Sequence, residues 1–380
     1  MSRIVPSSAT PSRALLAAGT YDLDAHPRFR VVLEGLRARG WDVEEVVAPL
    51  GLSTAERVDV LRRPSQLPRL AVAIARAWRT LVPRLVRRRR AAPRPAAVLV
   101  GYLGHFDAPL VRLLCRPRPV VLDYLISGAG TAVDRGAGGG VKQAALRLLD
   151  DVALRSADVV LVDTQEHADA LPVRYRDRAV VVPVGADERW FAAGAARAPR
   201  AETARTSVVF YGLLTPLQGA PVIAEALRLL DGAVDATVVG TGQDEAEVDR
   251  LLAGVPHVTR TSWVAADALP ALVAAHDVCL GVFGTGDKAR RVVPNKAYQG
   301  AAAGCVVVTS DTAPQRRAFG DDAVLVPPGD PVALADALRA LASDAGRRAE
   351  LAARSRRRAA DDFSARGVVR ELARELEARG

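Results

Sequence analysis

The sequence predicts an α/β protein of two domains, each built on a doubly wound parallel sheet. Short β-branched runs alternate with helical patterns from Ala14 to Pro183, and the same alternation restarts at Ser207. The stretch between them is rich in Ala, Arg, Gly and Pro and has no regular period, as is typical of a linker. A length of 380 residues is that of two ordinary domains. We therefore expect two Rossmann-like sheets that face each other across a cleft, with ligands outside the carboxyl ends of the strands.

The expected elements follow in order along the chain. Aliphatic runs predict first-domain strands at Ala14–Ala18, Val43–Val47, Ala97–Gly101, Val120–Asp123, Val159–Val162 and Val180–Pro183. Helical spacing predicts helices at Arg28–Arg39, Gln66–Arg90, Ala108–Leu114, Lys142–Arg155 and Gln165–Leu171. In the second domain we expect strands at Ser207–Tyr211, Ala236–Val239, His257–Thr259, Val278–Gly281, Cys305–Thr309 and Val324–Val326. Helices are expected at Gly219–Leu230, Asp244–Leu252, Ala268–Ala275, Asn295–Ala303, Pro331–Ala342 and Ser364–Ala378. The boundaries are then 1–190, a linker at 191–206, 207–360, and a C-terminal helix at 361–380 that can return to the first domain.

Composition excludes several classes of protein. With 49% hydrophobic and 25% charged residues, the chain is neither intrinsically disordered nor fibrous. Cys115, Cys279 and Cys305 are scattered through apolar runs, so we expect buried, reduced thiols and a cytoplasmic protein. The first residues resemble a disordered leader and not a secretory signal, and no apolar run reaches the roughly 18–20 residues that span a bilayer.

The basic charge is concentrated in one segment. Eleven arginines and no acidic residue lie between Arg62 and Arg94, more than the net charge of +9 of the whole chain. Apolar residues recur there at helical spacing, at Leu67, Leu70, Ala71, Ile74, Trp78, Leu81, Val82 and Leu85. Two interpretations stay open: residues 66–90 contact an anionic membrane surface, or they form a core helix whose solvated face is rich in arginine. Nucleic-acid binding is not expected, because no nucleic-acid-binding motif accompanies the charge.

Glycines follow two strands of the second domain. The segment FYGLLTPLQGA, at Phe210–Ala220, has Gly212 at a strand end and Gly219 at the start of a helix, whose free N–H groups suit an anion; an ordinary strand-to-helix turn is the alternative. The next strand ends in VVGTGQ, where Gly240 and Gly242 allow a ligand to approach the backbone. The third glycine of a dinucleotide fingerprint is missing, so NAD binding is disfavoured.

Cations gather in the segment from His276 to Ser310. A glycine-rich loop precedes Lys288, Arg290 and Arg291, and Lys296 follows on an Ala/Gly-rich helix. The chain has only three lysines, and two of them lie here, eight positions apart. Point charges beside a helix N-terminus suit a diphosphate, with a solvated charge cluster as the alternative.

In the first domain, polar side chains follow two strands. His105 and Asp107 come after the third strand, where one could orient the other, and a capping Asp107 beside an incidental His105 is the alternative. Asp123, Ser127 and Thr131 follow the next strand and could line a ligand site. Asp22 and Asp24 form an Asp-x-Asp string, which is able to hold a metal ion, but they lie in the first domain and away from the cations near Lys288, so we interpret them as chance or as polarity of the first domain's ligand side. No His/Cys cluster has zinc-ligand spacing, and we expect no metal and no cofactor.

Five segments follow one another along the chain: GTYDLDAHPRFRVVLEGLRARGWDV, FYGLLTPLQG, VVGTGQ, TSWVAADALPALVAAHDVCLGVF and VVPNKAYQGAAAGCVVVTS. Their order resembles glycosyltransferase family 4 (glycosyl transferases group 1) over nearly the whole chain. The pair of glutamates usual in the family falls on Arg291 and Gln299, and its usual Arg and Lys fall on Leu213 and Gln218. The diphosphate then has to be held by other cations, of which Lys288, Arg290, Arg291 and Lys296 are the candidates.

The resemblance implies the GT-B fold and a retaining glycosyltransferase that moves a sugar from a nucleoside diphosphate to an acceptor hydroxyl by front-face attack. The alternatives are a sugar-nucleotide-binding pseudo-enzyme and a sugar-nucleotide epimerase. The expected catalytic residues are His105, Asp107 and Lys288. Donor binding is expected at Gly212, Gln218, Gly240, Gly242, Trp263, Val264, Arg290, Arg291, Val292, Val293, Asn295, Lys296 and Gln299. Acceptor binding is expected at Gly19, Tyr21, Asp123 and Ser127.

Overall fold

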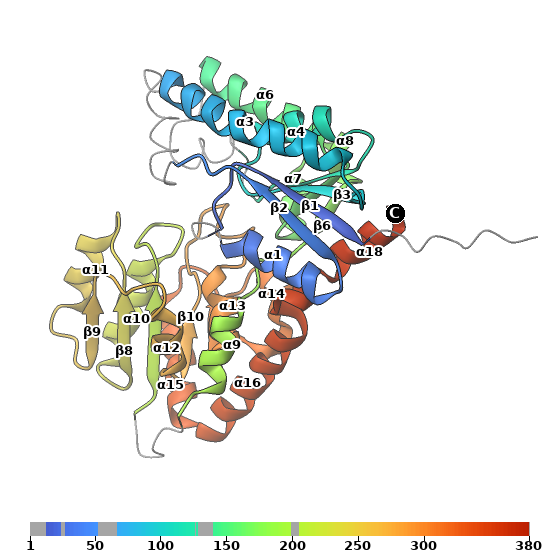
Figure 1. Cartoon of the computed structure of the whole chain (residues 1–380). Helices are drawn as coiled ribbons and strands as arrows, with labels where there is room; N and C mark the ends of the chain where they lie inside the picture. Colours follow the sequence, from blue (N-terminus) through green and yellow to red (C-terminus); the bar gives the residue numbers. More distant parts are fainter. Residues whose placement is uncertain are drawn as a thin grey trace, which may run out of the picture. The chain divides into compact units, whose positions relative to one another are not determined.

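The computed structural model describes residues 13–23, 27–51, 67–125, 127, 140–198 and 205–379. Contacts divide the chain into two compact units, which Figure 1 shows coloured along the sequence. The first unit comprises Met1–Val162, Leu171–Val182 and Val369–Gly380, and the second comprises Asp163–Ala170 and Pro183–Val368. The chain thus changes unit four times, and its last helix belongs with the first sheet.

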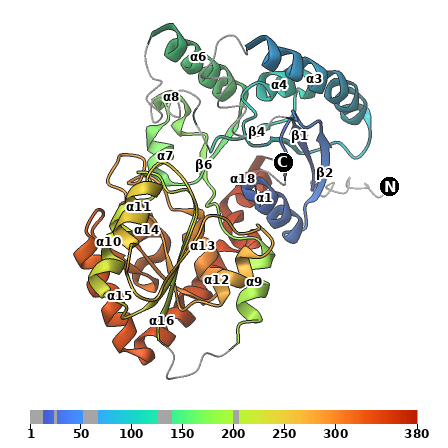
Figure 2. The ribbon, with the colours of Figure 1, turned by 90° about the vertical axis from the view of Figure 1, so that its left-hand side faces the viewer.

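The first unit is built on a six-stranded parallel sheet with the order β2-β1-β3-β4-β5-β6. Its strands are β1 (Ala14–Gly19), β2 (Asp42–Val47), β3 (Ala97–Val100), β4 (Val120–Asp123), β5 (Val159–Val162) and β6 (Ala179–Val181). Its helices are α1 (Pro27–Ala38), α3 (Leu67–Arg90), α4 (Asp107–Cys115), α6 (Gly140–Ser156), α8 (Val173–Arg176) and α18 (Arg370–Arg379). Figures 1 and 2 show α3, α4 and α6 on one face of the sheet and α1 and α18 on the other. With both faces covered, the central strands consist of aliphatic residues.

The second unit repeats this plan with the strand order β12-β11-β10-β7-β8-β9. Its strands are β7 (Ser207–Tyr211), β8 (Asp235–Val239), β9 (Val258–Thr261), β10 (Val278–Leu280), β11 (Val306–Ser310) and β12 (Val324–Val326). Its helices are α7 (Gln165–Ala170), α9 (Glu188–Ala195), α10 (Ala220–Leu230), α11 (Glu245–Leu252), α12 (Leu269–Ala274), α13 (Asn295–Ala302), α14 (Ala313–Phe319), α15 (Pro331–Ser343), α16 (Ala345–Arg358) and α17 (Ala365–Val368). A 3₁₀ turn at Gly320–Asp322 and a π-helical turn at Ala359–Phe363 complete it.

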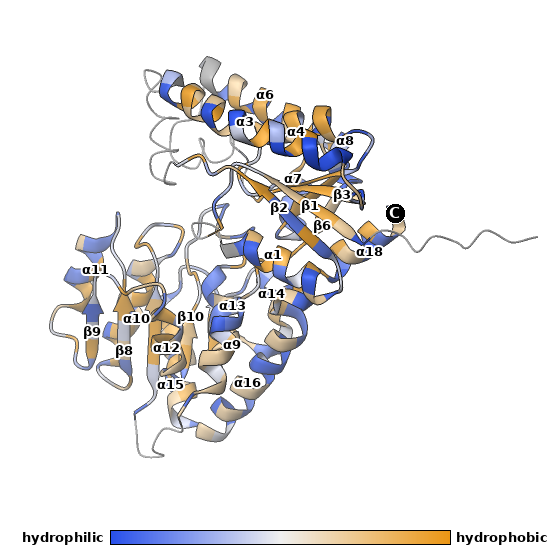
Figure 3. Cartoon of the chain, viewed as in Figure 1, coloured by the Kyte–Doolittle hydropathy of each residue, from blue (hydrophilic) through white to orange (hydrophobic). Residues whose placement is uncertain are grey.

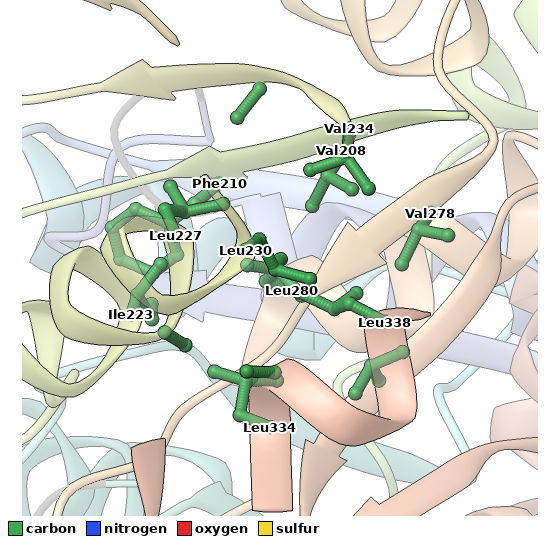
Figure 4. Close-up of a cluster of buried hydrophobic side chains, with 14 of the residues drawn as sticks. Val208, Phe210, Ile223, Leu227, Leu230, Val234, Val278, Leu280, Leu334 and Leu338 are labelled. Carbon is green, nitrogen blue, oxygen red and sulfur yellow. The ribbon is translucent and has the colours of Figure 1, made fainter. Parts of the chain in front are cut away.

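A large apolar core lies between this second sheet and the helices α10, α11 and α15. Figure 4 shows Val208 and Phe210 of β7 packed with Ile223 of α10 and Leu334 of α15. Helix α13 contacts β10 and β11, and α9 and α16 pack against α13. Burial of these aliphatic side chains from both faces is the main source of the stability of such a sheet.

The strands expected from the sequence are confirmed, with end positions that shift by one or two residues. The predicted helix at Ser364–Ala378 is two helices, α17 and α18. Four helices were not expected: α8, α9, α14 and α16. Helix α9 occupies part of the stretch that we interpreted as linker, because Asp187 caps its first turn and Trp190 stacks on Tyr211 of β7 at 5.9 Å between ring centroids. Gln66 and Thr131 lie outside the described residues.

The basic helix α3 belongs to the core of the first unit along its second half. Leu81 and Leu85 are fully buried, and Figure 3 shows hydrophilic and hydrophobic turns alternating along the helix. Two of its arginines are used within the unit: Arg88 donates to the carbonyl of Pro93 at 2.9 Å, and Arg89 donates to that of Leu114 at 2.7 Å. Among the residues that the structure describes, no helix is both long and apolar enough to cross a membrane.

All three cysteines are free and buried, as expected. Burial raises the pKa of each thiol. Cys305 donates to the carbonyl oxygens of Val273 and His276 at 3.3 Å, and Cys279 donates to that of Lys296 at 3.4 Å. The thiols therefore behave as small core side chains with raised pKa values.

Candidate functional site

The strand order of the second sheet reverses between β7 and β10, its topological switch point. In open parallel sheets ligands bind outside the carboxyl ends of the strands at this point. The strand β7 leads into Gly212, and β10 leads into Gly281. Most residues of the expected donor site follow these two strands or begin the helix α13, so the fold brings them to one edge of the sheet.

Three glycines let two loops at this edge lie against each other. The φ values are 139° at Gly212, 137° at Gly240 and 156° at Gly242. Residues that have a side chain rarely adopt such values. A Cβ on Gly240 would overlap the carbonyl oxygen of Gly212, and one on Gly242 would lie 2.8 Å from the nitrogen of Leu214. The nitrogen of Leu214 donates to the carbonyl of Thr241 at 2.9 Å. The close approach that we expected for a ligand at Gly240 and Gly242 is thus made by the neighbouring backbone.

Lys296 is the buried cation of this edge. The residue is only 5% exposed, and its Nζ donates to Oε1 of Gln218 at 2.6 Å. The Nζ also lies 3.9 Å from the centroid of the Phe210 ring. Burial lowers the pKa of this lysine to about 7. A Cβ on Gly212 would lie 3.1 Å from the Nζ, so the glycine leaves the room that the ammonium fills.

The turn that carries Gln218 is fixed by the strand end beside it. The nitrogen of Phe283 donates to the carbonyl of Gln218 at 2.9 Å, and Gly219 has a φ of 66°. A Cβ on Gly219 would lie 2.5 Å from the carbonyl carbon of Phe283. Gln218 therefore joins the turn after β7, the loop after β10 and the helix α13.

Gln299 accepts a hydrogen bond from one member of an aromatic pair. The hydroxyl of Tyr211 donates to its Oε1 at 2.8 Å, and the Tyr211 ring stacks on Trp190. Burial raises the pKa of Tyr211 well above its ordinary value, so this hydroxyl is a donor at all working pH values. The side chain of Gln299 is half-buried, about one turn into α13.

Before α13 lies a segment with three exposed cations. Lys288, Arg290 and Arg291 are exposed, and a turn forms in which the nitrogen of Arg291 donates to the carbonyl of Lys288 at 3.1 Å. Thr164 donates to the carbonyl of Arg291 at 2.8 Å, which ties residues 163–170 to this segment. Val293 is buried, Val292 is half-buried, and the exposed Asn295 begins the helix, which no side chain caps. An uncapped N-terminus beside three cations can hold an anion.

Two large apolar side chains are exposed at the same edge. Trp263, two residues beyond β9, is 73% exposed, and Leu213, two residues beyond β7, is 67% exposed. Val264 beside the tryptophan is half-buried. An exposed indole next to a ligand edge is able to stack on a planar ring.

The first sheet has its switch point between β1 and β3. Gly19 ends β1, and Gly101 follows β3. Tyr21 is only 1% exposed, and its ring lies 4.7 Å from that of Phe29 and against Gly101. The structure therefore places Tyr21 in the core of this edge and not on its surface.

The buried carboxylate of Asp107 links three elements through hydrogen bonds. Its Oδ2 accepts from the nitrogen and the hydroxyl of Thr20 at 2.7 and 2.9 Å, and its Oδ1 accepts from Nε1 of Trp78 at 2.9 Å. A Cβ on Gly19 would lie 3.1 Å from the same carboxylate. The carboxylate thus joins the end of β1, the middle of α3 and the start of α4, and Asp107 is 2% exposed.

His105 lies beside a different carboxylate from the one we expected. Its Nε2 is 3.2 Å from Oδ1 of Asp150 on α6, and its ring is 5.4 Å from that of Tyr124. Ser127 donates to Oδ2 of Asp150 at 2.7 Å. Burial raises the pKa of Tyr124. His105, Asp150 and Ser127 therefore form one polar cluster at the carboxyl end of β4.

Asp123 is engaged by a buried arginine. Arg28 of α1 donates from Nε to its Oδ1 at 3.0 Å, and from Nη1 to the carbonyl of Val182 at 2.8 Å. Both side chains are almost fully buried. The pair holds α1 against the ends of β4 and β6.

Sequence reasoning missed Asp150, Arg28 and Trp190, and it placed Trp78 only on the apolar face of its helix. The group that meets each of these side chains comes from another element of the fold. The local signal for Trp190 was Asp187, which caps the helix that carries it. Within the described ranges, no three His, Cys, Asp or Glu side chains are grouped so that they could hold a metal ion. Asp24 lies outside those ranges.

Comparison with known proteins agrees with this geometry. Residues 205–344 match the family model of glycosyl transferases group 1. No curated protein matches the chain. Among solved structures, sucrose-phosphate synthase from Thermosynechococcus elongatus superposes with a TM-score of 0.68 at 17% identity, over 97% of this chain and 99% of that one.

Two other solved structures are similar over comparable lengths. Alr3699/HepE of Anabaena, in complex with UDP-glucose, has a TM-score of 0.65 at 16% identity, over 96% of this chain and 99% of that one. An α,α-trehalose-phosphate synthase (UDP-forming) from Burkholderia vietnamiensis has a TM-score of 0.64 at 14% identity, over 97% and 100%. The predicted pair of parallel sheets is confirmed, and the chain has the GT-B fold.

Proposed function

We propose that this protein is a retaining, metal-independent glycosyltransferase that moves a sugar from a nucleoside-diphosphate sugar to an acceptor hydroxyl. The observation that carries the proposal is the buried Lys296 at the switch point of the second sheet. Its Nζ donates to Gln218 and lies next to Gly212, which has no side chain. A buried ammonium with an uncharged partner is stabilised by an incoming anion. The family model over residues 205–344 and the UDP-glucose bound to Alr3699/HepE support a sugar nucleotide as that anion.

In the proposed complex the diphosphate lies over Gly212 and the N-terminus of α13. Lys296 contacts it from within the sheet edge, and Lys288, Arg290 and Arg291 contact it from the exposed loop. These charges and the free amides of the helix stabilise the departing phosphate without a metal ion. Trp263 and Val264 lie beside the base, and Gln299 contacts the ribose.

The transfer step is a front-face displacement. The bond between the anomeric carbon and the phosphate oxygen breaks, and the acceptor oxygen bonds to the same face of that carbon. The departing phosphate oxygen takes the acceptor proton, so the products are a glycoside with retained configuration and a nucleoside diphosphate. His105, held beside Asp150, is proposed to contact the transferred sugar or the acceptor, with Gly19, Asp123 and Ser127 on the acceptor side.

A thermal-shift screen across UDP-, GDP- and dTDP-sugars tests the donor. A ligand that binds only the native state raises the melting temperature by mass action, and at 100 times its Kd it adds about 2.7 kcal/mol. We expect one nucleotide class to stabilise the protein and Lys296→Met to lose most of that shift. No shift with any sugar nucleotide would refute donor binding.

Product analysis then separates the alternatives. A transferase releases nucleoside diphosphate when an acceptor is present, and EDTA leaves its rate unchanged. An epimerase converts the sugar nucleotide without an acceptor, and a pseudo-enzyme binds the donor but forms no product. The pseudo-enzyme is the alternative that the chain itself motivates, because Arg291 and Gln299 stand where the family usually has glutamates.

We further propose that the enzyme is cytoplasmic and touches the inner face of the membrane through α3. Leu81 and Leu85 are buried in the first unit, so the contact comes from the exposed arginines and from Val72, which is 49% exposed. Juxtamembrane Lys and Arg residues are attracted to anionic lipid by about 1 kcal/mol each. Flotation with anionic liposomes, and none with neutral liposomes, is the expected result; equal flotation with both would refute it.

A further inference from the structure

A hollow of about 410 Å³ lies between α3 and the loop that follows β2. Its lining residues come from these two segments of the first unit: Val47, Ala48, Pro49, Leu50, Ala73, Arg76, Ala77, Thr80 and Arg84. The volume is in the range of sites for small ligands. None of these residues belongs to the site described above.

The hollow exists because one face of α3 carries small side chains. Ala73, Ala77 and Thr80 follow one another at spacings of four and three residues, and therefore lie on the same side of the helix. The large residues Leu81 and Leu85 point into the core instead. Space remains between the small face and Pro49 and Leu50 of the facing loop.

Among the described residues, two positive charges line this space and no negative charge does. Within the described part of the chain Arg76 has no ion-pair partner, and the guanidinium of Arg84 donates only to the carbonyl of Val47, at 3.3 Å. The nearest acids along β2 are already used, since Glu44 pairs with Arg88 and Glu45 pairs with Arg37. The hollow is thus cationic on one side and apolar on the other.

Its position is next to the switch point of the first sheet. The nitrogen of Ala48 donates to the carbonyl of Gly19 at 3.0 Å, and that of Leu50 donates to the carbonyl of Thr20 at 3.2 Å. The loop that walls the hollow therefore runs along the end of β1, where ligands of such sheets bind.

We propose that this hollow binds the phosphate of an amphiphilic acceptor, a phosphate ester of an alkyl or prenyl chain whose head group carries the accepting hydroxyl. Arg76 and Arg84 hold the phosphate through charge-assisted hydrogen bonds, and the first carbons of the chain pack on Pro49, Leu50 and Ala73. The site itself stands on the geometry of the first unit; its role as the acceptor site rests on the proposed transferase function.

Calorimetry with decyl phosphate, below its critical micelle concentration and without donor, tests the site. Two probes separate the sources of the chemistry: glucose 6-phosphate has the phosphate without the chain, and octyl glucoside has a chain without the phosphate. We expect decyl phosphate to bind at least 10-fold more tightly than either. Equal binding of glucose 6-phosphate would overturn the amphiphile, and equal binding of octyl glucoside would overturn the role of the charges.

Variants on the same helix provide the controls. Arg76→Gln with Arg84→Gln is expected to weaken decyl phosphate at least 10-fold, whereas Arg79→Gln, exposed on α3 outside the hollow, leaves it unchanged. Ala73→Leu fills the hollow with all charges kept and is also expected to lose binding, which covers the case of a double variant that fails to fold. An equal loss in Arg79→Gln, or full binding in Ala73→Leu, would overturn the site. Donor binding is measured separately with UDP-glucose, so a failed donor and a failed hollow give different results.

Discussion

The Nζ of Lys296 on α13 donates a hydrogen bond of 2.6 Å to the Oε1 of Gln218, in the turn that follows β7. The partner of this buried ammonium is a neutral amide, and its other neighbour is the face of the Phe210 ring. Neither compensates a full charge, so burial lowers the pKa of Lys296 to about 7. Lys296 therefore gains or loses its proton near neutral pH, beside the proposed diphosphate.

The stability of the protein is predicted to depend on pH through this lysine. A lysine in the unfolded chain has a pKa of about 10.4. Between about pH 7 and 10 the unfolded state therefore binds more protons than the native state. The difference in unfolding free energy between wild type and Lys296→Met therefore increases with pH, by up to about 1.4 kcal/mol per pH unit. Thermal melts of the two proteins from pH 7 to 9.5 measure this difference, with Lys288→Met as the exposed control. Parallel melting curves for wild type and Lys296→Met would contradict the assignment.

Donor binding is predicted to take up a proton at pH 8. At that pH Lys296 is mostly neutral, and a diphosphate beside it raises its pKa again. UDP-glucose does not itself titrate there, so calorimetry in buffers of different ionisation enthalpy reports the uptake. At donor concentrations that saturate both proteins, we expect close to one proton per bound donor for wild type and none for Lys296→Met, which removes the titrating amine. The same uptake in both proteins would assign the proton to another group.

Turnover is predicted to depend on Lys288. The side chain is exposed in the loop before α13, so Lys288→Ala removes a phosphate contact without removing core packing. The loss of a charge that stabilises the leaving group costs about 10²-fold in kcat. Steady-state kinetics with the donor from the screen measures this, with Arg290→Ala beside it for comparison. Near-normal turnover of Lys288→Ala with an unchanged melting temperature would remove Lys288 from the proposed mechanism.

Gly240→Ala is predicted to destabilise the second unit. The added Cβ would overlap the carbonyl oxygen of Gly212, and the φ of 137° is strained for any residue but glycine. We expect a loss of more than about 2 kcal/mol in unfolding free energy. Gly286→Ala, where the added Cβ meets nothing within 4 Å, is the matched control and should stay within about 0.5 kcal/mol. Urea unfolding of both variants measures this difference. Equal midpoints for Gly240→Ala and Gly286→Ala would show that the two loops move apart without cost.

Asp107→Asn is predicted to destabilise the first unit. The carboxylate accepts three hydrogen bonds, from Thr20 and from Trp78, and an amide that replaces one oxygen by NH₂ faces a donor with a donor. We expect a cost of about 1–3 kcal/mol, with the exposed Asp42→Asn as control. If Asp107→Asn instead melts with wild type and loses turnover, the group has the catalytic role that the sequence suggested.

Much of the fold followed from local patterns. Aliphatic runs such as Val120–Asp123 and Val159–Val162 predicted strands, because a parallel strand covered on both faces has to be apolar throughout. Helices with a weak apolar stripe were missed. Helix α16, AGRRAELAARSRRR, has few apolar positions, and the Asp344 cap that begins it, accepting from Arg347 at 2.8 Å, is a short-range signal easily taken for a loop.

The candidate site was predictable as a set of segments but not as a set of contacts. The sequence alone determined that Gly212, Gln218 and Lys296 lie near strand ends of one parallel sheet, since the carboxyl ends of such strands share an edge. Only the tertiary structure decided that Lys296 is buried against Gln218 while Lys288 is exposed, and that the partner of His105 is Asp150 and not Asp107. The physical reason is that spacing along a chain fixes which face of its own element a residue occupies, whereas the group that meets that face comes from an element far away in sequence, chosen by the packing of whole helices on a sheet.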